Sequence, residues 1–121
     1  MIHILIVEDE KPISELMRMS LRKAGYQCTC VFNGEQAADV LEKRSFDLIL
    51  LDAVMPDLSG PEVLCRLRVR GVTVPALAVT GLDAGDPALA GFDEVLTKPL
   101  TGASLGAALL RHLPAEKIRY D

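Results

Sequence analysis

The chain has 121 residues, half of them hydrophobic and a quarter charged, which fits one globular domain with a single core. Its net charge is −4, and aromatic residues make up only 4% of it, so the core must be aliphatic. An acidic chain whose Lys and Arg residues are scattered argues against a nucleic-acid-binding surface. The densest basic group is Arg66, Arg68 and Arg70, which we interpret as a solvated helix face.

Two further features bear on the cellular location. The chain opens directly on a strand-like segment, and no apolar run approaches the ~18 residues of a membrane span. The chain has an odd number of cysteines, namely Cys28, Cys30 and Cys65. They lack the spacing and the His partners of a zinc site. Cys28 and Cys30 lie two apart, so we expect both thiols on one face of a strand as small apolar side chains. The sequence therefore predicts a cytoplasmic protein with reduced cysteines and no membrane contact.

Short apolar runs alternate with longer amphipathic segments along the chain. The apolar runs predict five strands, at 2–7, 27–32, 48–51, 76–79 and 94–96. We expect four helices. They should start at Pro12, Asn33, Pro61 and Thr101 and end at Gly25, Arg44, Gly71 and Leu113, respectively. The residues expected to face the core are Ile13, Leu16, Met17 and Leu21 in the first helix and Ala37, Ala38 and Leu41 in the second. This alternation predicts an α/β fold with a parallel sheet, right-handed crossovers and helices on both faces.

Polar side chains follow four of the predicted strands. In open α/β sheets, functional groups collect at the carboxyl ends of the strands. The residues at these ends are Glu8, Asp9 and Glu10 after the first strand, Asp52 after the third, Thr80 after the fourth and Lys98 after the fifth. We therefore expect three or four carboxylates, one hydroxyl and one ammonium to converge on a single edge of the sheet.

Such a group of carboxylates points to a divalent cation and a phosphate. Carboxylates with nothing to neutralise them would repel one another, and Mg²⁺ prefers carboxylate oxygens, water and a substrate phosphate as ligands. Asp52 is the natural nucleophile, because a carboxylate can form an acyl phosphate. The cation and Lys98 would stabilise the oxygens of the transferring phosphoryl group, and Thr80 would hydrogen-bond one of them.

Each residue also has a simpler interpretation when it is taken alone. Glu8, Asp9 and Glu10 could be an acidic first turn favoured by the helix dipole, and Asp52 could be a turn former at a strand end. Thr80 could cap a helix, and Lys98 could be a surface charge. The functional interpretation rests on their shared position at one edge of the sheet.

Four segments resemble the receiver domains of two-component response regulators: ILIVEDE at 4–10, LLDAVMP at 50–56, VTG at 79–81 and TKP at 97–99. The resemblance runs from Ile2 to about Leu113, which is nearly the whole chain. It implies a flavodoxin-like, doubly wound, five-stranded parallel sheet with strand order 2-1-3-4-5.

The resemblance also implies a metal site. Carried over residue by residue, Glu8 and Asp9 would be the acidic pair that holds Mg²⁺ (or Mn²⁺). Asp52 would be the phosphoacceptor and a further metal ligand. The backbone carbonyl of Val54 would complete the protein ligands.

The remaining roles concern the phosphoryl group. Thr80 would be the switch hydroxyl, and Lys98 would be the ammonium that pairs with phosphate. The Lys98–Pro99 peptide is expected to be cis. The implied donor is the phosphohistidine of a sensor histidine kinase or a histidine phosphotransfer protein. The domain would be a signalling switch that catalyses its own phosphoryl acceptance and turns over no external substrate.

One departure from the family lies three residues before the lysine. Receivers usually carry Tyr, Phe or His there, and the rotamer of that ring follows the switch hydroxyl. Here the residue is Val95, a β-branched aliphatic side chain that cannot swing in the same way. We expect this relay to be altered while phosphorylation itself remains.

A second departure is the length of the segment before the lysine. From Thr80 to Lys98 is 18 positions (98 − 80), about one helical turn less than in typical receivers. The stretch 82–90 contains Gly85 and Pro87, so the fourth helix is expected to be a single turn or a loop. In the family, the face made by this helix, the fifth strand and the last helix commonly mediates dimerisation. We expect that this face does not form the common phosphorylation-driven dimer.

The residues two positions after Asp52 and Thr80 are Val54 and Leu82, and both are apolar. They flank the expected path of an attacking water and offer no group to orient it. We therefore expect slow self-dephosphorylation.

The sequence also bears on two other function classes. A receiver-like protein-interaction domain that signals without phosphorylation is favoured by Val95 and the short fourth helix, and opposed by the intact acidic set. A flavin-binding electron carrier of the same fold would need a hydroxyl- and glycine-rich loop after the first strand. The carboxylates of Glu8, Asp9 and Glu10 would repel a flavin phosphate there.

We expect residues 1–114 to form the receiver domain. Residues 115–121 would be a tail, or the start of a linker to an effector domain on the C-terminal side.

Overall fold

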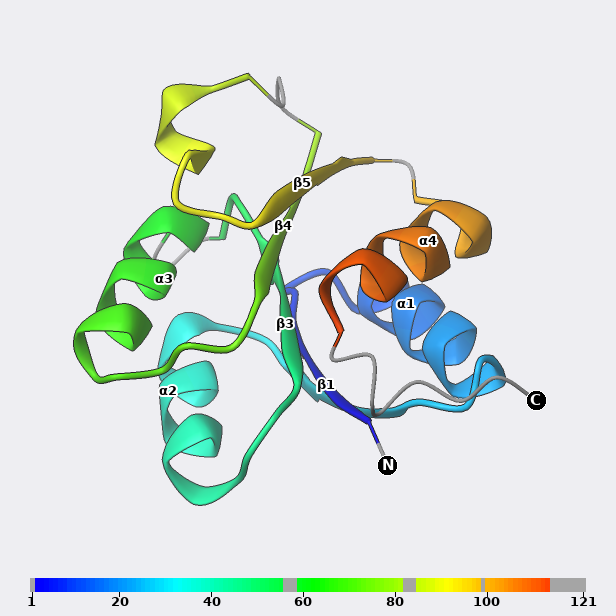
Figure 1. The fold of residues 1–121 in the computed structure, drawn as a ribbon, viewed down its shortest axis with the longest axis horizontal. Helices are drawn as coiled ribbons and strands as arrows, with labels where there is room; N and C mark the ends of the chain where they lie inside the picture. The colour runs from blue at the N-terminus through cyan, green and yellow to red at the C-terminus, as the bar shows by residue number, and fades with distance from the viewer. Residues whose placement is uncertain (1, 56–58, 82–84, 99, 114–121) are drawn as a thin grey trace.

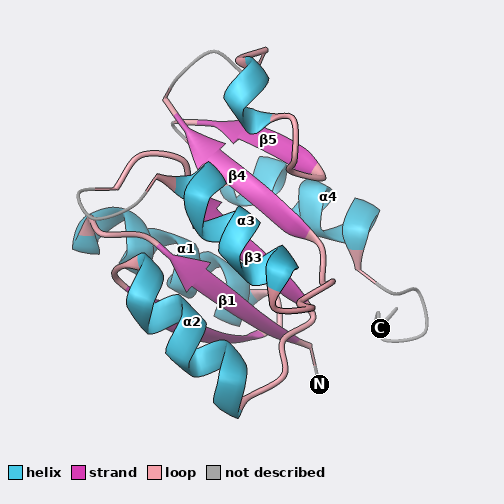
Figure 2. Cartoon of the chain, turned by 90° about the vertical axis from the view of Figure 1, so that its left-hand side faces the viewer, coloured by secondary structure: helices cyan, strands magenta, loops and turns pink. Residues whose placement is uncertain are grey.

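Five parallel strands form the sheet of this protein. The computed structural model describes residues 2–55, 59–81, 85–98 and 100–113. The strands are β1 (His3–Val7), β2 (Gln27–Val31), β3 (Leu48–Asp52), β4 (Ala76–Thr80) and β5 (Glu94–Thr97). They are ordered β2-β1-β3-β4-β5, which confirms the predicted flavodoxin-like topology. Figure 2 shows the arrowheads of β1, β4 and β5 pointing to the same edge of the sheet.

Some predictions fall outside the described ranges. These are the cis peptide before Pro99, the position of Leu82, the helix stop at Pro114 and the tail at 115–121.

Helices cover both faces of the sheet. They are α1 (Lys11–Lys23), α2 (Gly34–Lys43), α3 (Gly60–Val69), a 3-10 turn η1 (Pro87–Leu89) and α4 (Gly102–His112). Figure 1 shows α1 and α4 on one side of the sheet and α2 and α3 on the other. No helix in the described ranges combines the length and the apolar character needed to span a bilayer.

The central strands are buried on both faces because helices cover both. In β1, Ile4 and Ile6 point into the cluster beneath α1 and α4, whereas Leu5 and Val7 point into the cluster beneath α2 and α3. All five residues of β3 and of β4 are buried as well. A strand covered on both faces reads as a continuous apolar run, which explains why these strands are plain in the sequence.

Side-chain caps fix where the helices begin. The Asn33 side chain accepts a hydrogen bond from the backbone of Gln36 at 2.8 Å, as its place before α2 predicted. Ser59 accepts in the same way from Glu62 at the start of α3. Thr101 forms a capping box with α4, because its hydroxyl and a side chain three residues on each bond the other's backbone N–H.

The predicted reduction of the fourth helix is confirmed, because between β4 and β5 the described residues form only the three-residue turn η1. Leu89 and Phe92 are buried there and fill the core beside α3. The turn that follows is tied down by Asp93, whose carboxylate accepts the backbone N–H of Ala76 at 2.8 Å. A short connection with two buried anchors thus replaces a packed helix.

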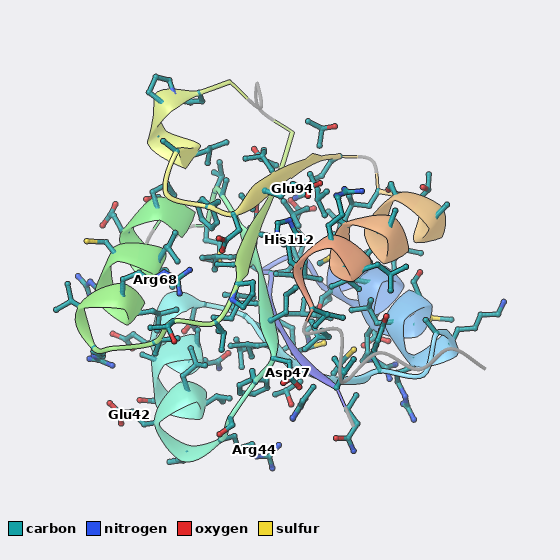
Figure 3. All side chains as sticks on the ribbon, in the orientation of Figure 1. Glu42, Arg44, Asp47, Arg68, Glu94 and His112 are labelled. Carbon is teal, nitrogen blue, oxygen red and sulfur yellow. The ribbon has the colours of Figure 1, made fainter. Side chains whose placement is uncertain are left out.

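Arg68 corrects one prediction. It was expected on a solvated helix face with Arg66 and Arg70, but its side chain is half-buried and points from α3 toward the sheet (Figure 3). Its Nη1 donates to the carbonyls of Val72 at 2.9 Å and Val74 at 2.8 Å. Arg68 thus holds the loop after α3 by donating to two of its carbonyls.

Two residues that were predicted to face the core are less buried than expected. Leu16 is 55% exposed although it recurs at helical spacing, because the buried stripe of α1 runs through Ser14, Met17 and Leu21. Ala38 is half-buried rather than central to the inner face of α2. The thiols of Cys28 and Cys30 do share a face, as expected, and both pack against the cluster beneath α1 and α4.

An ion-pair cluster joins β5 to the end of α4. Glu94 accepts from Arg111 Nε at 2.9 Å, pairs with the Arg111 guanidinium a second time, and lies 2.8 Å from His112 Nε2. Figure 3 shows Glu94 and His112 facing each other from the two elements. The hydrogen bonds from Arg111, with help from His112, lower the pKa of Glu94 to about 2 against the opposing effect of burial. The cluster holds the edge strand β5 to the last helix.

Gly60 begins α3 where its backbone crosses the end of β3. A Cβ added there would lie 2.6 Å from the Asp52 carbonyl oxygen and 2.8 Å from the Ala53 Cα. The Gly60 N–H also donates to the Ala53 carbonyl at 2.9 Å. Only glycine allows α3 to start this close to the residues that carry Asp52.

The Glu94 cluster predicts a pH-dependent contribution to stability. Because the folded-state pKa of Glu94 is depressed, its stabilising effect is present above the unfolded value of about 4.5 and is lost as pH falls toward about 2. Glu94→Gln should therefore lower the free energy of unfolding at neutral pH, and the deficit should shrink as acid is added. Urea unfolding across this pH range measures it. Glu42→Gln, which breaks an exposed pair with Arg70, should have little effect. A deficit that does not change with pH would contradict the cluster.

Gly60 gives a second stability prediction. Gly60→Ala should destabilise the fold by about 1–3 kcal/mol, because the new methyl meets backbone that cannot move aside. Gly106→Ala in α4 is the matched control: nothing lies within 4 Å of its added Cβ, so it should stabilise by roughly 0.5–1 kcal/mol. Urea unfolding of both variants checks the pair, and effects of the same sign would count against the close approach at Gly60.

Candidate functional site

The carboxyl edge of the sheet brings the predicted site residues together. Glu8 follows β1, Asp52 ends β3 and Thr80 ends β4, and all three are buried. Lys98 follows β5, and its backbone N–H donates to the Thr80 carbonyl at 2.8 Å, which continues the ladder past the strand ends. Parallel strands of similar length end together, so four residues far apart in the sequence meet at one edge.

Three carboxylates lie close enough to share a cation. Glu8, Asp9 and Asp52 each offer a carboxylate oxygen, and these oxygens all lie within 4.8 Å of one another. Oxygens bound to one Mg²⁺ are at most about 4.2 Å apart, twice a metal–oxygen distance of about 2.1 Å. Small side-chain adjustments would therefore close this group around one ion.

Glu8 is the most constrained of the three. Its side chain is fully buried, and its Oε2 accepts a long hydrogen bond of 3.4 Å from the backbone of Glu10. Its Oε1 lies 3.2 Å from the Lys98 ammonium, close enough for an ion pair. The two groups are not aligned for a hydrogen bond, and Oε1 accepts no hydrogen bond from any of the described residues. Burial, and next Asp52, raise the pKa of Glu8 to about 8, while Lys98 acts in the opposite direction. A buried oxygen with incomplete compensation fits a hard cation.

Lys98 is the ammonium of the site. Its Nζ lies 3.2 Å from Glu8 Oε1 and 3.7 Å from Asp52 Oδ2, so it bridges two buried carboxylates. Burial opposes its charged form, but Glu8, Asp52 and Glu10 outweigh burial and raise the pKa of Lys98. Its side chain remains 23% exposed. A charged group that is anchored yet reachable from outside can contact an incoming anion.

Asp52 and its neighbours have backbone support. The Val54 N–H donates to Asp52 Oδ1 at 3.2 Å, and the Ala53 N–H donates to the Val79 carbonyl at 3.0 Å. The side chain of Val54 is 59% exposed, so the backbone at this position lies at the rim of the site. Thr80 is almost fully buried and pairs in register with Thr97. The predicted site residues are therefore assembled, and their individual roles remain predictions.

An apolar groove beside Lys98 was not predicted from the sequence. It has a volume of about 350 Å³ and lies between α1 and the segment that leads into α4. Ile13, Leu16, Leu100 and Leu105 line it, and Lys98 lies at its border with the acidic site. The periodicity of α1 gave no signal for this groove, because an apolar residue at helical spacing suits a groove as well as a core.

A family model and a sequence relative identify the type of domain. The model of the response regulator receiver domain matches residues 4–110. YkoG of Bacillus subtilis, described as an uncharacterized transcriptional regulatory protein, is 38% identical over 101 residues, which is 80% of this chain and 44% of YkoG. This chain thus spans less than half the length of that relative.

Solved structures agree with the family model. The response regulator protein TrrA of Thermotoga maritima, solved in complex with Mg²⁺-BeF, is 30% identical with a TM-score of 0.86, covering 93% of this chain and 100% of TrrA. The chemotaxis protein CheY4 of Vibrio cholerae is 27% identical with a TM-score of 0.89, covering 93% of this chain and 99% of CheY4. With a family match over most of its length, this chain belongs to the response regulator receiver domains, the signal-receiving modules of two-component systems.

Proposed function

We propose that this receiver domain is a phosphorylation-dependent switch in which Asp52 accepts a phosphoryl group with the help of Mg²⁺. The observation that carries the proposal is the cluster of Glu8, Asp9 and Asp52, whose carboxylate oxygens lie within 4.8 Å of one another beside the ammonium of Lys98. A structural ion pair would need one carboxylate for one ammonium. Three carboxylates around one partly exposed lysine leave negative charge that a divalent cation would balance.

Each residue of the site would have a separate role. Glu8, Asp9 and Asp52, with the Val54 carbonyl, would hold Mg²⁺ (or Mn²⁺). When bound, this ion supplies positive charge to the oxygens of the transferring phosphoryl group. Lys98, 3.7 Å from Asp52 Oδ2, would pair with another of those oxygens and stabilise the charge that they carry during transfer.

The transfer forms one bond and breaks one. A carboxylate oxygen of Asp52 attacks phosphorus, and the P–N bond to the donor's histidine breaks, with the electron pair leaving on the imidazole nitrogen. The product is an acyl phosphate on Asp52. Thr80, buried at the end of the neighbouring strand, would hydrogen-bond a phosphoryl oxygen and move toward it.

The donor is a phosphohistidine on a sensor histidine kinase or a histidine phosphotransfer protein. The apolar groove between α1 and α4 supports this choice, because it borders Lys98 and could receive the apolar face of a partner helix next to the acceptor. Leu16, 55% exposed, lies on the wall of that groove. A partner seated there would bring its phosphohistidine to the carboxyl edge of the sheet.

The central prediction is phosphorylation of Asp52. The full chain, incubated with Mg²⁺ and a small phosphodonor such as phosphoramidate, should gain the mass of one phosphoryl group in intact-mass measurements. Asp52→Asn should abolish the gain, and Asp39→Asn, on the exposed side of α2, should leave it intact. The proposal fails if the wild-type chain gains no mass, which would favour signalling by protein contacts alone, or if the gain survives in Asp52→Asn.

A second prediction separates the metal ligands from the lysine. Glu8→Gln should weaken Mg²⁺ binding by about tenfold or more, because it removes a ligand charge. Lys98→Met should tighten Mg²⁺ binding, since the ammonium 3.2 Å from Glu8 competes with the ion. The same Lys98→Met variant should accept phosphate about a hundredfold more slowly. Calorimetric Mg²⁺ titration and timed intact-mass measurements give the two quantities. Weaker Mg²⁺ binding by Lys98→Met would contradict the assignment of roles.

A further inference from the structure

Strand β2 is an open edge of the sheet. It pairs only with β1 among the described strands. Its Gln27 N–H donates to the Ile2 carbonyl at 2.9 Å, and its Val31 carbonyl accepts from the Glu8 N–H at 3.1 Å. In a parallel ladder, the N–H and C=O of one residue both point to the same neighbouring strand, and those of the next residue point to the opposite side. Gln27 and Val31 bond to β1, so the N–H and C=O groups of Cys28 and Cys30 point away from β1. An edge with unpaired N–H and C=O groups is a template for another strand.

A basic hollow lies along the first half of this edge. Its volume is about 360 Å³, and three arginines line it: Arg18 and Arg22 from α1, and Arg44 from the end of α2. Figure 3 shows Arg44 at the end of α2, beside the segment that leads to Asp47. The β2 residues Cys28 and Thr29 form part of the same wall. Guanidinium groups thus flank the open strand from both faces of the sheet.

The positive charge of the hollow is only partly neutralised. Arg18 pairs with Glu15 at 2.7 Å, but in the described ranges Arg22 and Arg44 form no ion pair. Among the other groups near the wall, burial raises the pKa of the Cys28 thiol to about 11, and the Asp47 carboxylate accepts the backbone N–H of His3 at 2.9 Å. Asp47 is one negative charge beside three arginines. Helix dipoles favour a basic residue at the ends of α1 and α2, but they do not require both to face the same edge strand.

We propose that the β2 edge is a docking site for an extended, acidic segment of a partner protein, which adds to the sheet as a further strand beside β2. Main-chain bonds to Cys28 and Cys30 would supply the pairing. Because side chains of a strand alternate between faces, carboxylates of the added strand would reach Arg18 and Arg22 on one face and Arg44 on the other.

Charge decides between this occupant and a second copy of the chain. Two copies paired edge to edge would bring two sets of these arginines together, and like charges at close range oppose such pairing. The site is also separate from the phosphoacceptor, because the hollow lies along the first residues of β2 whereas Asp52 lies at the carboxyl edge. Binding at the β2 edge therefore does not require phosphorylation of Asp52.

Amide exchange of the full chain tests the docking site. The probe is a short acetylated peptide of alternating glutamate and valine. We expect the Cys28 and Cys30 amides to exchange about tenfold or more slowly with the peptide at millimolar concentration. The Thr29 amide, which the ladder turns toward β1, serves as the internal control and should change little. No protection of Cys28 and Cys30 would overturn the proposal.

Matched variants and peptides exclude simpler explanations. Binding should weaken at least about tenfold in the double variant Arg22→Glu, Arg44→Glu, and should persist in Arg70→Glu, whose arginine follows α3 and pairs with Glu42. A peptide of the same sequence with alternate backbone nitrogens methylated should bind much more weakly, because it cannot pair with an edge. Equal binding of the methylated peptide, or displacement of the parent peptide by equimolar inorganic triphosphate, would mean a general anion site and overturn strand addition. Protection of Cys28 and Cys30 at high protein concentration without peptide would instead indicate a second copy.

Discussion

Glu8 and Asp52 are buried carboxylates at the ends of adjacent central strands, and Lys98 bridges them at 3.2 and 3.7 Å. Burying a charge is unfavourable unless a partner compensates it, and one ammonium compensates two carboxylates incompletely. Burial, and next the neighbouring Asp52, raise the pKa of Glu8, in the direction that this shortfall requires. The cation proposed above would add to this compensation, and the sheet beneath the site must hold the carboxylates together.

The close approach at Gly60 supplies part of that rigidity. It lets α3 begin against the backbone of Asp52 and Ala53, so the end of β3 is held from both sides. The ladder bond from Lys98 to Thr80 does the same for β4 and β5. These contacts are made by backbone atoms, and the one at Gly60 requires that this residue carry no side chain.

The sequence predicted the strands and the acidic edge well for a physical reason. Strands covered on both faces must be apolar throughout, so the first polar residue after each run marks the carboxyl edge, as Glu8 and Asp52 do. Where the sequence misled, the pattern had two physical solutions. Leu16 fits a groove as well as a core, and Arg68 caps loop carbonyls from a helix face that looked solvated. The pairing of Glu94 with Arg111 joins two elements, and no local pattern encodes it.

Helix α1 borders both the groove beside Lys98 and the basic hollow along β2. Its buried stripe is narrow, so Leu16 and Met19 remain 55% and 62% exposed. One face, with Ile13, Leu16, Met17 and Ser20, borders the groove beside Lys98, while Arg18 and Arg22 line the hollow at the β2 edge from another face. A partner in the groove would meet apolar surface, and one at the β2 edge would meet arginine and open backbone. Because these surfaces differ in chemistry and lie on different faces of α1, we expect that the proposed phosphodonor and the proposed acidic partner would not compete for one surface.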